Sequence, residues 1–265
     1  MNCNDAAVRP VRNMLCRVPS SISAAILSGA VLAAVSCTSE TPGIAASSRG
    51  THIAPNQEPR ATSPYEQIDT VEIFIDSTEF GRAGFNALVI SQIRTSDSVY
   101  VHLLFLSKKN GTFEERSSSY WLKDGLSGLH AEVADFNNDG YKDLTFVSAT
   151  AARGANEVRR LFIYDPASDE LKFISNSMNY PNLRYNPKLR CIDGFRVYAG
   201  SSTDFLRLQG DSLFMFATVA LMEGVVVTTF DADKQGRVIH QDATYEGGYI
   251  RFENFSPLEV LEGDW

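Results

Sequence analysis

Turn-forming residues recur roughly every 8–15 residues from Ile68 onward and separate short runs that are typical of β-strands. Only one window, 214–222, has any helical period. The chain is therefore expected to form an all-β, or at least β-dominated, single domain over residues 66–265, most simply a β-sandwich. The expected strands are 70–76, 87–94, 98–106, 112–116, 129–134, 144–147, 158–164, 171–174, 195–199, 205–208, 212–217, 224–230, 237–245 and 249–252.

Composition fits a globular protein and argues against a nucleic-acid partner. Hydrophobic residues make up 44% of the 265 residues and charged residues 21%, which leaves enough apolar side chains for a core. The net charge is −8, and no cluster of lysine or arginine follows residue 60. Binding to phosphates needs a basic surface, so we expect no nucleic-acid partner.

The N-terminal residues 1–36 have the pattern of an export signal. Arg9, Arg12 and Arg17 precede the apolar run 24–35, which is too short for a good membrane-spanning helix. The run ends in Ala34-Val35-Ser36-Cys37, which resembles the lipobox of bacterial lipoproteins. Residues 37–65 are rich in Ser, Thr, Pro, Gly and Ala, as in a flexible tether.

These features predict an exported protein whose membrane contact is a lipid anchor at Cys37, in the outer membrane or periplasm. The alternative is an ordinary cleaved signal peptide, with Cys37 near the cut by chance. Met14 is an alternative start to Met1. In the mature chain Cys191 has no cysteine left to pair with, and it is expected to behave as a small buried apolar residue.

No catalytic pattern is found in the sequence. There is no Gly-x-Ser-x-Gly turn and no glycine-rich phosphate loop, and the four histidines lack metal-ligand spacing. A H-x-E triplet at His130 lacks the cysteine pair of a zinc deaminase. The chain is therefore expected not to be an enzyme.

The segment 135–144 predicts a calcium site. Asp135, Asn137 and Asp139 offer oxygens at positions one, three and five, and Gly140 permits the tight turn at position six. Tyr141 would offer its backbone carbonyl and Asp143 its side chain. Position twelve is a phenylalanine instead of the bidentate glutamate, so the loop is only EF-hand-like and is expected to bind Ca²⁺ with modest affinity between two strands.

Two acidic segments also fit an ordinary turn without a metal. The loop at 135–144 could be an ordinary Asp/Asn/Gly hairpin turn, which has a similar composition. A second segment, Asp231-Ala-Asp233-Lys-Gln235-Gly236, matches the calcium pattern at fewer positions and is expected to be a hairpin turn without a metal.

Asp-x-Asn-x-Asp-Gly-x-x-Asp-Leu resembles the loop of FG-GAP and VCBS repeats, but it occurs once and the chain is too short for a propeller of such repeats. Segments 161–173 and 199–213, together with this loop, resemble bacterial exported lipoproteins related to I-type lysozyme inhibitors. The best-known members are immunity proteins against peptidoglycan-cleaving effectors of a type IV secretion system.

That resemblance implies a calcium-stabilised envelope lipoprotein that binds and inhibits a cell-wall glycosidase. In the family, a loop with a Ser-Gly pair and a tyrosine enters the active site of the target. The matching partner-binding segment here is Gly200, Ser201, Ser202 and Phe205, with phenylalanine where a tyrosine is expected. A phenyl ring cannot hydrogen-bond a catalytic carboxylate. The alternative function is a calcium-dependent surface binding or adhesion module without an enzyme target.

Overall fold

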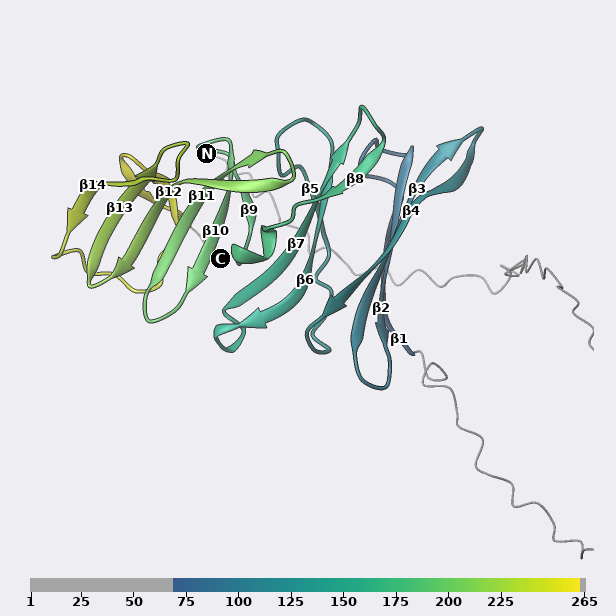
Figure 1. Cartoon of the computed structure of the whole chain (residues 1–265), viewed down its shortest axis with the longest axis horizontal. Coiled ribbons are helices and arrows are strands. Elements are labelled where there is room, and N and C mark those ends of the chain that lie inside the picture. The colour runs from purple at the N-terminus through teal and green to yellow at the C-terminus, as the bar shows by residue number, and fades with distance from the viewer. Residues whose placement is uncertain (1–68, 263–265) are drawn as a thin grey trace, which may run out of the picture. The chain divides into compact units, whose positions relative to one another are not determined.

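The computed structural model describes residues 69–262, all of which lie in one compact unit (Figure 1). This part of the chain consists of β-strands and two 3-10 turns, η1 (Ala152–Gly154) and η2 (Ser177–Asn179), and contains no α-helix. The prediction of an all-β fold is confirmed. The predicted signal, tether and Cys37 lie outside the described residues.

The first sheet has four antiparallel strands in chain order. Alternation of buried and partly exposed side chains along its third strand shows that one face of the sheet is buried. Asn110 and Gly111 both have positive φ, 52° and 84°, as the hairpin between the third and fourth strands requires. The strands are β1 (Asp69–Asp76), β2 (Asn86–Arg94), β3 (Val99–Lys109) and β4 (Thr112–Lys123).

The second sheet also has four antiparallel strands in chain order, and its two central strands carry long runs of buried residues. A sheet covered on both faces has such runs in place of alternation. Its strands are β5 (Glu132–Ala134), β6 (Asp143–Ala151), β7 (Asn156–Asp165) and β8 (Glu170–Phe173).

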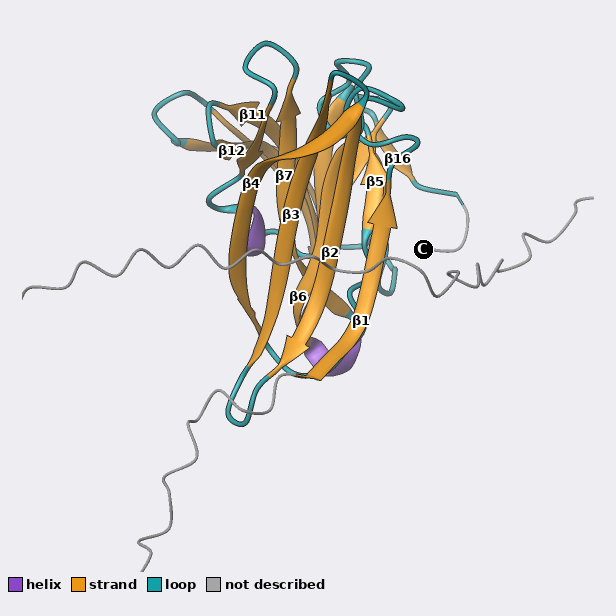
Figure 2. Ribbon diagram, turned by 90° about the vertical axis from the view of Figure 1, so that its right-hand side faces the viewer, coloured by secondary structure: helices purple, strands orange, loops and turns teal. Residues whose placement is uncertain are grey.

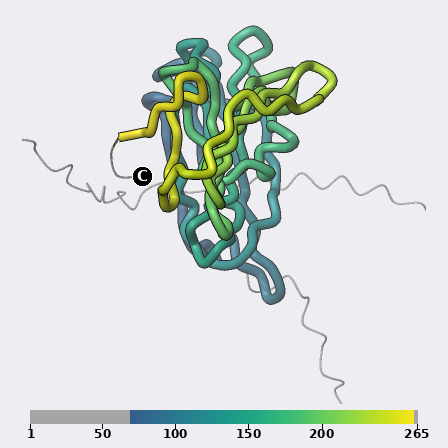
Figure 3. The backbone as a smooth tube through the Cα atoms, turned by 90° about the vertical axis from the view of Figure 1, so that its left-hand side faces the viewer, coloured from purple at the N-terminus to yellow at the C-terminus, as the bar shows by residue number. Residues whose placement is uncertain are grey.

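The third sheet has six antiparallel strands, again in chain order, and a two-stranded hairpin follows it. The C-terminal segment, yellow in Figure 3, lies against the third sheet. The strands are β9 (Arg184–Asn186), β10 (Cys191–Val197), β11 (Ser201–Gln209), β12 (Ser212–Met222), β13 (Gly224–Phe230) and β14 (Gly236–Asp242), and then β15 (Phe252–Phe255) and β16 (Leu258–Val260) of the hairpin.

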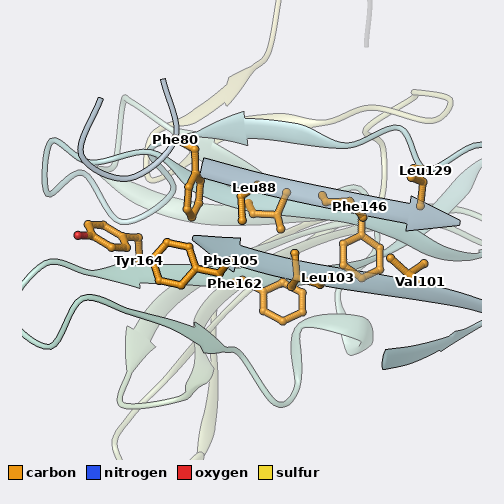
Figure 4. Packing of buried hydrophobic residues seen from close by; sticks show 11 residues of the cluster. Phe80, Leu88, Val101, Leu103, Phe105, Leu129, Phe146, Phe162 and Tyr164 are labelled. Atoms are coloured by element: carbon orange, nitrogen blue, oxygen red, sulfur yellow. The ribbon is translucent and has the colours of Figure 1, made fainter. Parts of the chain in front are cut away.

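Three buried clusters hold these sheets together. The first lies between the first and second sheets and joins Leu88 and Phe105 to Phe146 and Phe162 (Figure 4). The second joins the second sheet to the third, and the third joins the far face of the third sheet to Phe252 of the C-terminal hairpin. The order of layers therefore follows the order of the chain.

Two details differ from the predictions. The domain has three stacked sheets and a covering hairpin, which is one layer more than a two-sheet sandwich. The window 214–222, where a helical period was noted, lies within strand β12. A run of mostly apolar residues fits a buried strand as well as a buried helix, and pairing with β11 and β13 decides the outcome.

Candidate functional site

The predicted calcium loop connects β5 to β6 in the second sheet. Gly140 has φ +92° and Asn138 has φ 59°, so the backbone turns sharply where the loop pattern places its glycine. Tyr141 leaves the turn and packs edge-on against Tyr164, with ring centroids 5.8 Å apart. The loop is flanked by strands on both sides, as predicted.

Side-chain oxygens in the first half of the loop accept hydrogen bonds from the loop's own backbone. Asp135 accepts from the amides of Asp139 and Gly140, at 3.2 and 2.9 Å. Asn137 accepts from the Asp139 amide at 3.1 Å, and Asp139 accepts from the Tyr141 amide at 2.9 Å. These contacts gather the oxygens of Asp135, Asn137 and Asp139 over one short stretch of backbone.

Asp143, the first residue of β6, is fully buried at the end of the loop. Its carboxylate accepts hydrogen bonds from the amides of Phe136 at 2.8 Å and Tyr164 at 2.9 Å. Burial is the main cause that raises the pKa of Asp143 to about 7, and the carboxylates of Asp139 and Asp135 also raise it. The two backbone hydrogen bonds lower this pKa, but by less. The three carboxylates are thus close enough to repel one another.

Among the described residues, no ion pair offsets this repulsion. Across residues 69–262, none of the ion pairs includes Asp135, Asp139 or Asp143. The same residues contain no group of three His, Cys, Asp or Glu side chains arranged to hold a metal. The oxygen set and the buried carboxylate suit a hard cation such as Ca²⁺, while the side chains themselves are engaged with backbone amides.

The second acidic segment is a turn, as expected. It joins β13 to β14, and Asp231 accepts hydrogen bonds from the amides of Asp233 and Gln235 at 3.0 and 2.9 Å. Lys234 has φ 60°. Both Asp231 and Asp233 are exposed, so this turn lacks a buried carboxylate comparable with Asp143.

The segment predicted as a possible partner-binding loop is mostly a buried strand. Ser201, Ser202 and Phe205 all lie in β11, between β10 and β12 of the third sheet, and all three are buried. Gly200 precedes the strand, and a Cβ atom there would lie 2.1 Å from the carbonyl oxygen of Leu221. The polar composition of 200–202 predicted a loop before the strand at 205–208, but pairing on both sides makes Ser201 and Ser202 part of a central strand.

Phe205 belongs to the third core cluster. Its ring lies 5.5 Å from that of Phe255 and 6.4 Å from that of Phe216, measured between centroids. Cys191 lies in the same cluster, and burial raises the pKa of its thiol to about 12. Such a thiol stays protonated at neutral pH and is a poor nucleophile.

One candidate surface was not recognised in the sequence. The outer face of the first sheet, seen in Figure 2, carries three cross-strand rows that contain no charged side chain. Among its exposed apolar members, Ile73 and Ile75 are 57% and 64% exposed, and Tyr120 and Leu122 are 65% and 59% exposed. The rows are Ile75–Val89–Leu104–Ser118, Ile73–Ser91–His102–Tyr120 and Ile93–Tyr100–Leu122.

No part of residues 69–262 covers this face. The first core cluster takes the opposite face of the same strands, through Leu88, Ile90, Val101, Leu103 and Phe105. The stacked rings of His102 and Tyr120, with centroids 4.4 Å apart, give the middle row a flat aromatic end. A signal was present in the sequence: β1 and β3 carry apolar residues at successive positions, where a strand with one solvated face would alternate with polar ones.

None of the helical turns in the described part of the chain is long or apolar enough to span a membrane.

Comparison with known proteins shows distant structural likeness and no sequence match. No protein family and no curated protein matches the sequence. Among solved structures, the fold is similar to that described as "Structure of a Xanthomonas Type IV Secretion System related protein", with a TM-score of 0.38 and 12% identity over 66% of this chain and 100% of the other.

Proposed function

We propose that this chain is a calcium-stabilised, lipid-anchored binding protein of the cell envelope that docks a protein partner and has no catalytic activity. The observation that carries the proposal is the uncharged apolar outer face of β1–β4. Soluble domains seldom expose a contiguous apolar surface of this kind unless it binds something. The resemblance of the loop and its neighbouring segments makes a peptidoglycan-cleaving glycosidase the proposed partner.

The face has the composition of the centre of a protein interface. Charged residues are depleted at interface centres, and aromatic residues are enriched there. Here Tyr100, His102 and Tyr120 lie among isoleucine, valine and leucine side chains, and a charged residue, Glu115, enters only in the next row, opposite Leu106. An apolar patch on the partner would complement this surface.

The docking face is tested by placing a charge in it. Ile73→Glu is expected to weaken binding at least about 100-fold, because a carboxylate would be buried without a partner in the complex. The probes are an I-type lysozyme and the peptidoglycan hydrolases that the immobilised chain retains from an envelope extract. Binding is measured by surface plasmon resonance, and inhibition by the clearing of a peptidoglycan suspension.

Val238→Glu is the matched control. Val238 is 55% exposed on β14, close to the 57% of Ile73, but it lies on a different sheet. This variant is expected to bind like the wild type. Equal losses in the two variants, or no retained protein in repeated captures, would contradict docking through β1–β4.

The alternative of a binding or adhesion module without an enzyme target is favoured by one observation. Burial of Ser201, Ser202 and Phe205 in β11 removes the segment that would enter a glycosidase active site. The same assay separates the two functions. Retention of a hydrolase whose activity falls on binding supports inhibition, whereas retention of a protein without hydrolase activity, through the same face, supports the alternative.

Calcium would be held by side-chain oxygens of Asp135, Asn137, Asp139 and Asp143 and by the backbone carbonyl of Tyr141. A bound Ca²⁺ would supply the positive charge that offsets the repulsion among three carboxylates. It would thereby hold together the ends of β5 and β6, which the loop joins. The proposed effect is structural, since the loop lies between two strands and not beside a catalytic group.

Removing calcium is expected to destabilise the domain. With a dissociation constant of roughly 10⁻⁴–10⁻³ M, 10 mM Ca²⁺ would stabilise the fold by about 1–3 kcal/mol, which raises the melting temperature by roughly 3–10 °C. Asp139→Ala should abolish the difference between calcium and chelator, measured by differential scanning calorimetry. Asp233→Ala, in the second acidic turn, should keep it. Identical melting of the wild type with calcium and with chelator would refute the metal assignment.

A further inference from the structure

A groove of about 540 Å³ lies on the third sheet, at β10, β11 and β12. Its volume falls in the range of small-molecule sites. It lies on different strands from the apolar outer face of β1–β4. The residues that line it are Tyr180, Arg196, Tyr198, Ser202, Asp204, Met215, Thr218 and Ala220.

The floor of the groove is polar and centred on Asp204, a buried residue of β11. Thr218 of β12 donates a hydrogen bond to its Oδ1 at 2.7 Å. On the other side, the Arg196 guanidinium lies 3.7 Å from Oδ2, which is too far for a hydrogen bond. Burial raises the pKa of Asp204. Ser202 also hydrogen-bonds this carboxyl group. Because a carboxylate can accept about four hydrogen bonds, the group still has room for a further partner.

Position 194, directly opposite Asp204 on β10, is a glycine. A Cβ atom there would lie 3.0 Å from the Cβ of Tyr180, so the missing side chain lets Tyr180 lie close over the sheet. The glycine thus brings an aromatic ring and a buried carboxyl group into one groove.

Two tyrosines flank the floor. Tyr198 is 38% exposed, and its hydroxyl donates to the carbonyl of Ser201 at 3.2 Å, which fixes the phenol end of the ring. Tyr180 is partly exposed. Burial raises the pKa of both phenols, and the charge of Asp204 raises it further. Both tyrosines line the groove that contains Asp204, and Tyr180 also packs in part against the second core cluster.

This combination suits a neutral sugar better than other small ligands. A pyranose ring has an apolar C–H face, which packs on an aromatic ring, and hydroxyl groups at its edge, which pair with carboxylate, guanidinium and hydroxyl groups. An anionic ligand is disfavoured because Asp204 opposes the charge of Arg196. A purely apolar ligand would exclude water from the acceptor positions of Asp204 that Thr218 does not occupy, which is unfavourable.

We propose that the β10–β12 groove is a saccharide-binding site, in which Tyr198 and Tyr180 pack on a neutral pyranose and Asp204, Arg196 and Thr218 hydrogen-bond its hydroxyls. The site goes beyond the proposed docking of a protein partner, and it depends neither on the outer face of β1–β4 nor on calcium.

Isothermal titration calorimetry of the folded domain tests the site. The probes are four neutral tetrasaccharides: the β-1,4-linked oligomers of N-acetylglucosamine, glucose and mannose, and the α-1,4-linked oligomer of glucose. At least one is expected to bind. Tyr198→Ala should weaken that binding about 10-fold or more. Tyr198→Phe should change it less than about threefold, because the ring face remains and the lost hydroxyl bonds only the chain's own carbonyl.

Two further variants separate a site from a loss of fold. Tyr249→Ala removes another tyrosine that is 53% exposed and lies outside the groove, and it should bind like the wild type. Asp204→Asn keeps the shape of the side chain and should weaken binding about 10-fold, with the melting temperature of each variant checked in parallel. Binding of none of the four oligosaccharides, or equal binding by Tyr198→Ala and Tyr249→Ala, overturns the proposal. Ile73→Glu should bind sugar like the wild type. A failure of the proposed docking face can therefore be told apart from a failure of the proposed saccharide site.

Discussion

Replacing Arg251 with methionine is expected to lower the free energy of unfolding by about 3–5 kcal/mol, the usual cost of breaking a buried ion pair by removing one partner. Asp193 would keep the more distant Arg184, at 3.7 Å, and its hydrogen bond from Asn186. Arg251 precedes β15, and its guanidinium bonds Asp193 of β10 through Nε at 2.7 Å and through Nη2. It also donates to the carbonyl of Asn182 at 2.9 Å. Both charged side chains are almost fully buried, so Asp193 would lose a cation that water cannot replace.

Urea unfolding followed by tryptophan fluorescence measures this effect, and the melting temperature should fall by roughly 6–20 °C. Arg237→Met, on the exposed edge strand β14, is the control and should change stability by less than about 0.5 kcal/mol. Adding Asp193→Asn to Arg251→Met should recover part of the loss, because the stranded carboxylate is then neutral. If Arg251→Met lost no more stability than Arg237→Met, the ion pair between Arg251 and Asp193 would not be shielded from water.

Phe205→Ala is expected to cost about 3–5 kcal/mol of stability, as is usual for truncation of a core phenylalanine. The ring is fully buried among Phe216, Phe255 and the neighbouring strands. Phe205→Tyr should also destabilise, by about 1–3 kcal/mol, because its hydroxyl would enter an apolar cluster without a partner.

The same denaturation experiment distinguishes a core residue from a recognition residue. Phe85→Ala, at a phenylalanine that is 38% exposed, should cost less than about 1 kcal/mol. If Phe205→Ala kept full stability and lost partner binding, the segment would be part of a binding surface after all. The expected result is the reverse, a loss of stability before any specific loss of binding.

Strand positions could be predicted where local sequence decides them. The hairpin at Asn110-Gly111 and the Asp231 turn depend on residues that tolerate positive φ or bond their own backbone, and both occur as expected. Strand β4 was expected to end at residue 116, but it continues to Lys123 through three serines. Those serines are strand residues because β3 pairs with them, which is tertiary information.

The candidate sites also divide into a local pattern that the sequence predicts and surfaces that depend on strand pairing. The calcium loop is a local pattern, so its turn geometry at Gly140 followed from sequence. The segment at Ser201–Ser202 has the composition of a loop, and only its two neighbouring strands make it central. Successive apolar residues in β1 and β3 are a local sign of the outer face. The extent of that face and the β10–β12 groove depend on the pairing of several strands, which no single stretch of sequence contains.

The order of strands has a consequence for how the chain folds. Each sheet pairs only strands that follow one another, so each can form from contacts that are close in sequence, and such contacts favour rapid folding. The first sheet could therefore form before residues beyond Lys123 have left a ribosome or a translocation channel. The ion pair between Asp193 and Arg251 joins residues that are 58 positions apart. It can therefore form only after the chain as far as Arg251 is available. That contact would close last. A chain cut before Arg251 would keep the strands of its three large sheets, but the cation recorded beside Asp193 would then be the more distant Arg184, at 3.7 Å.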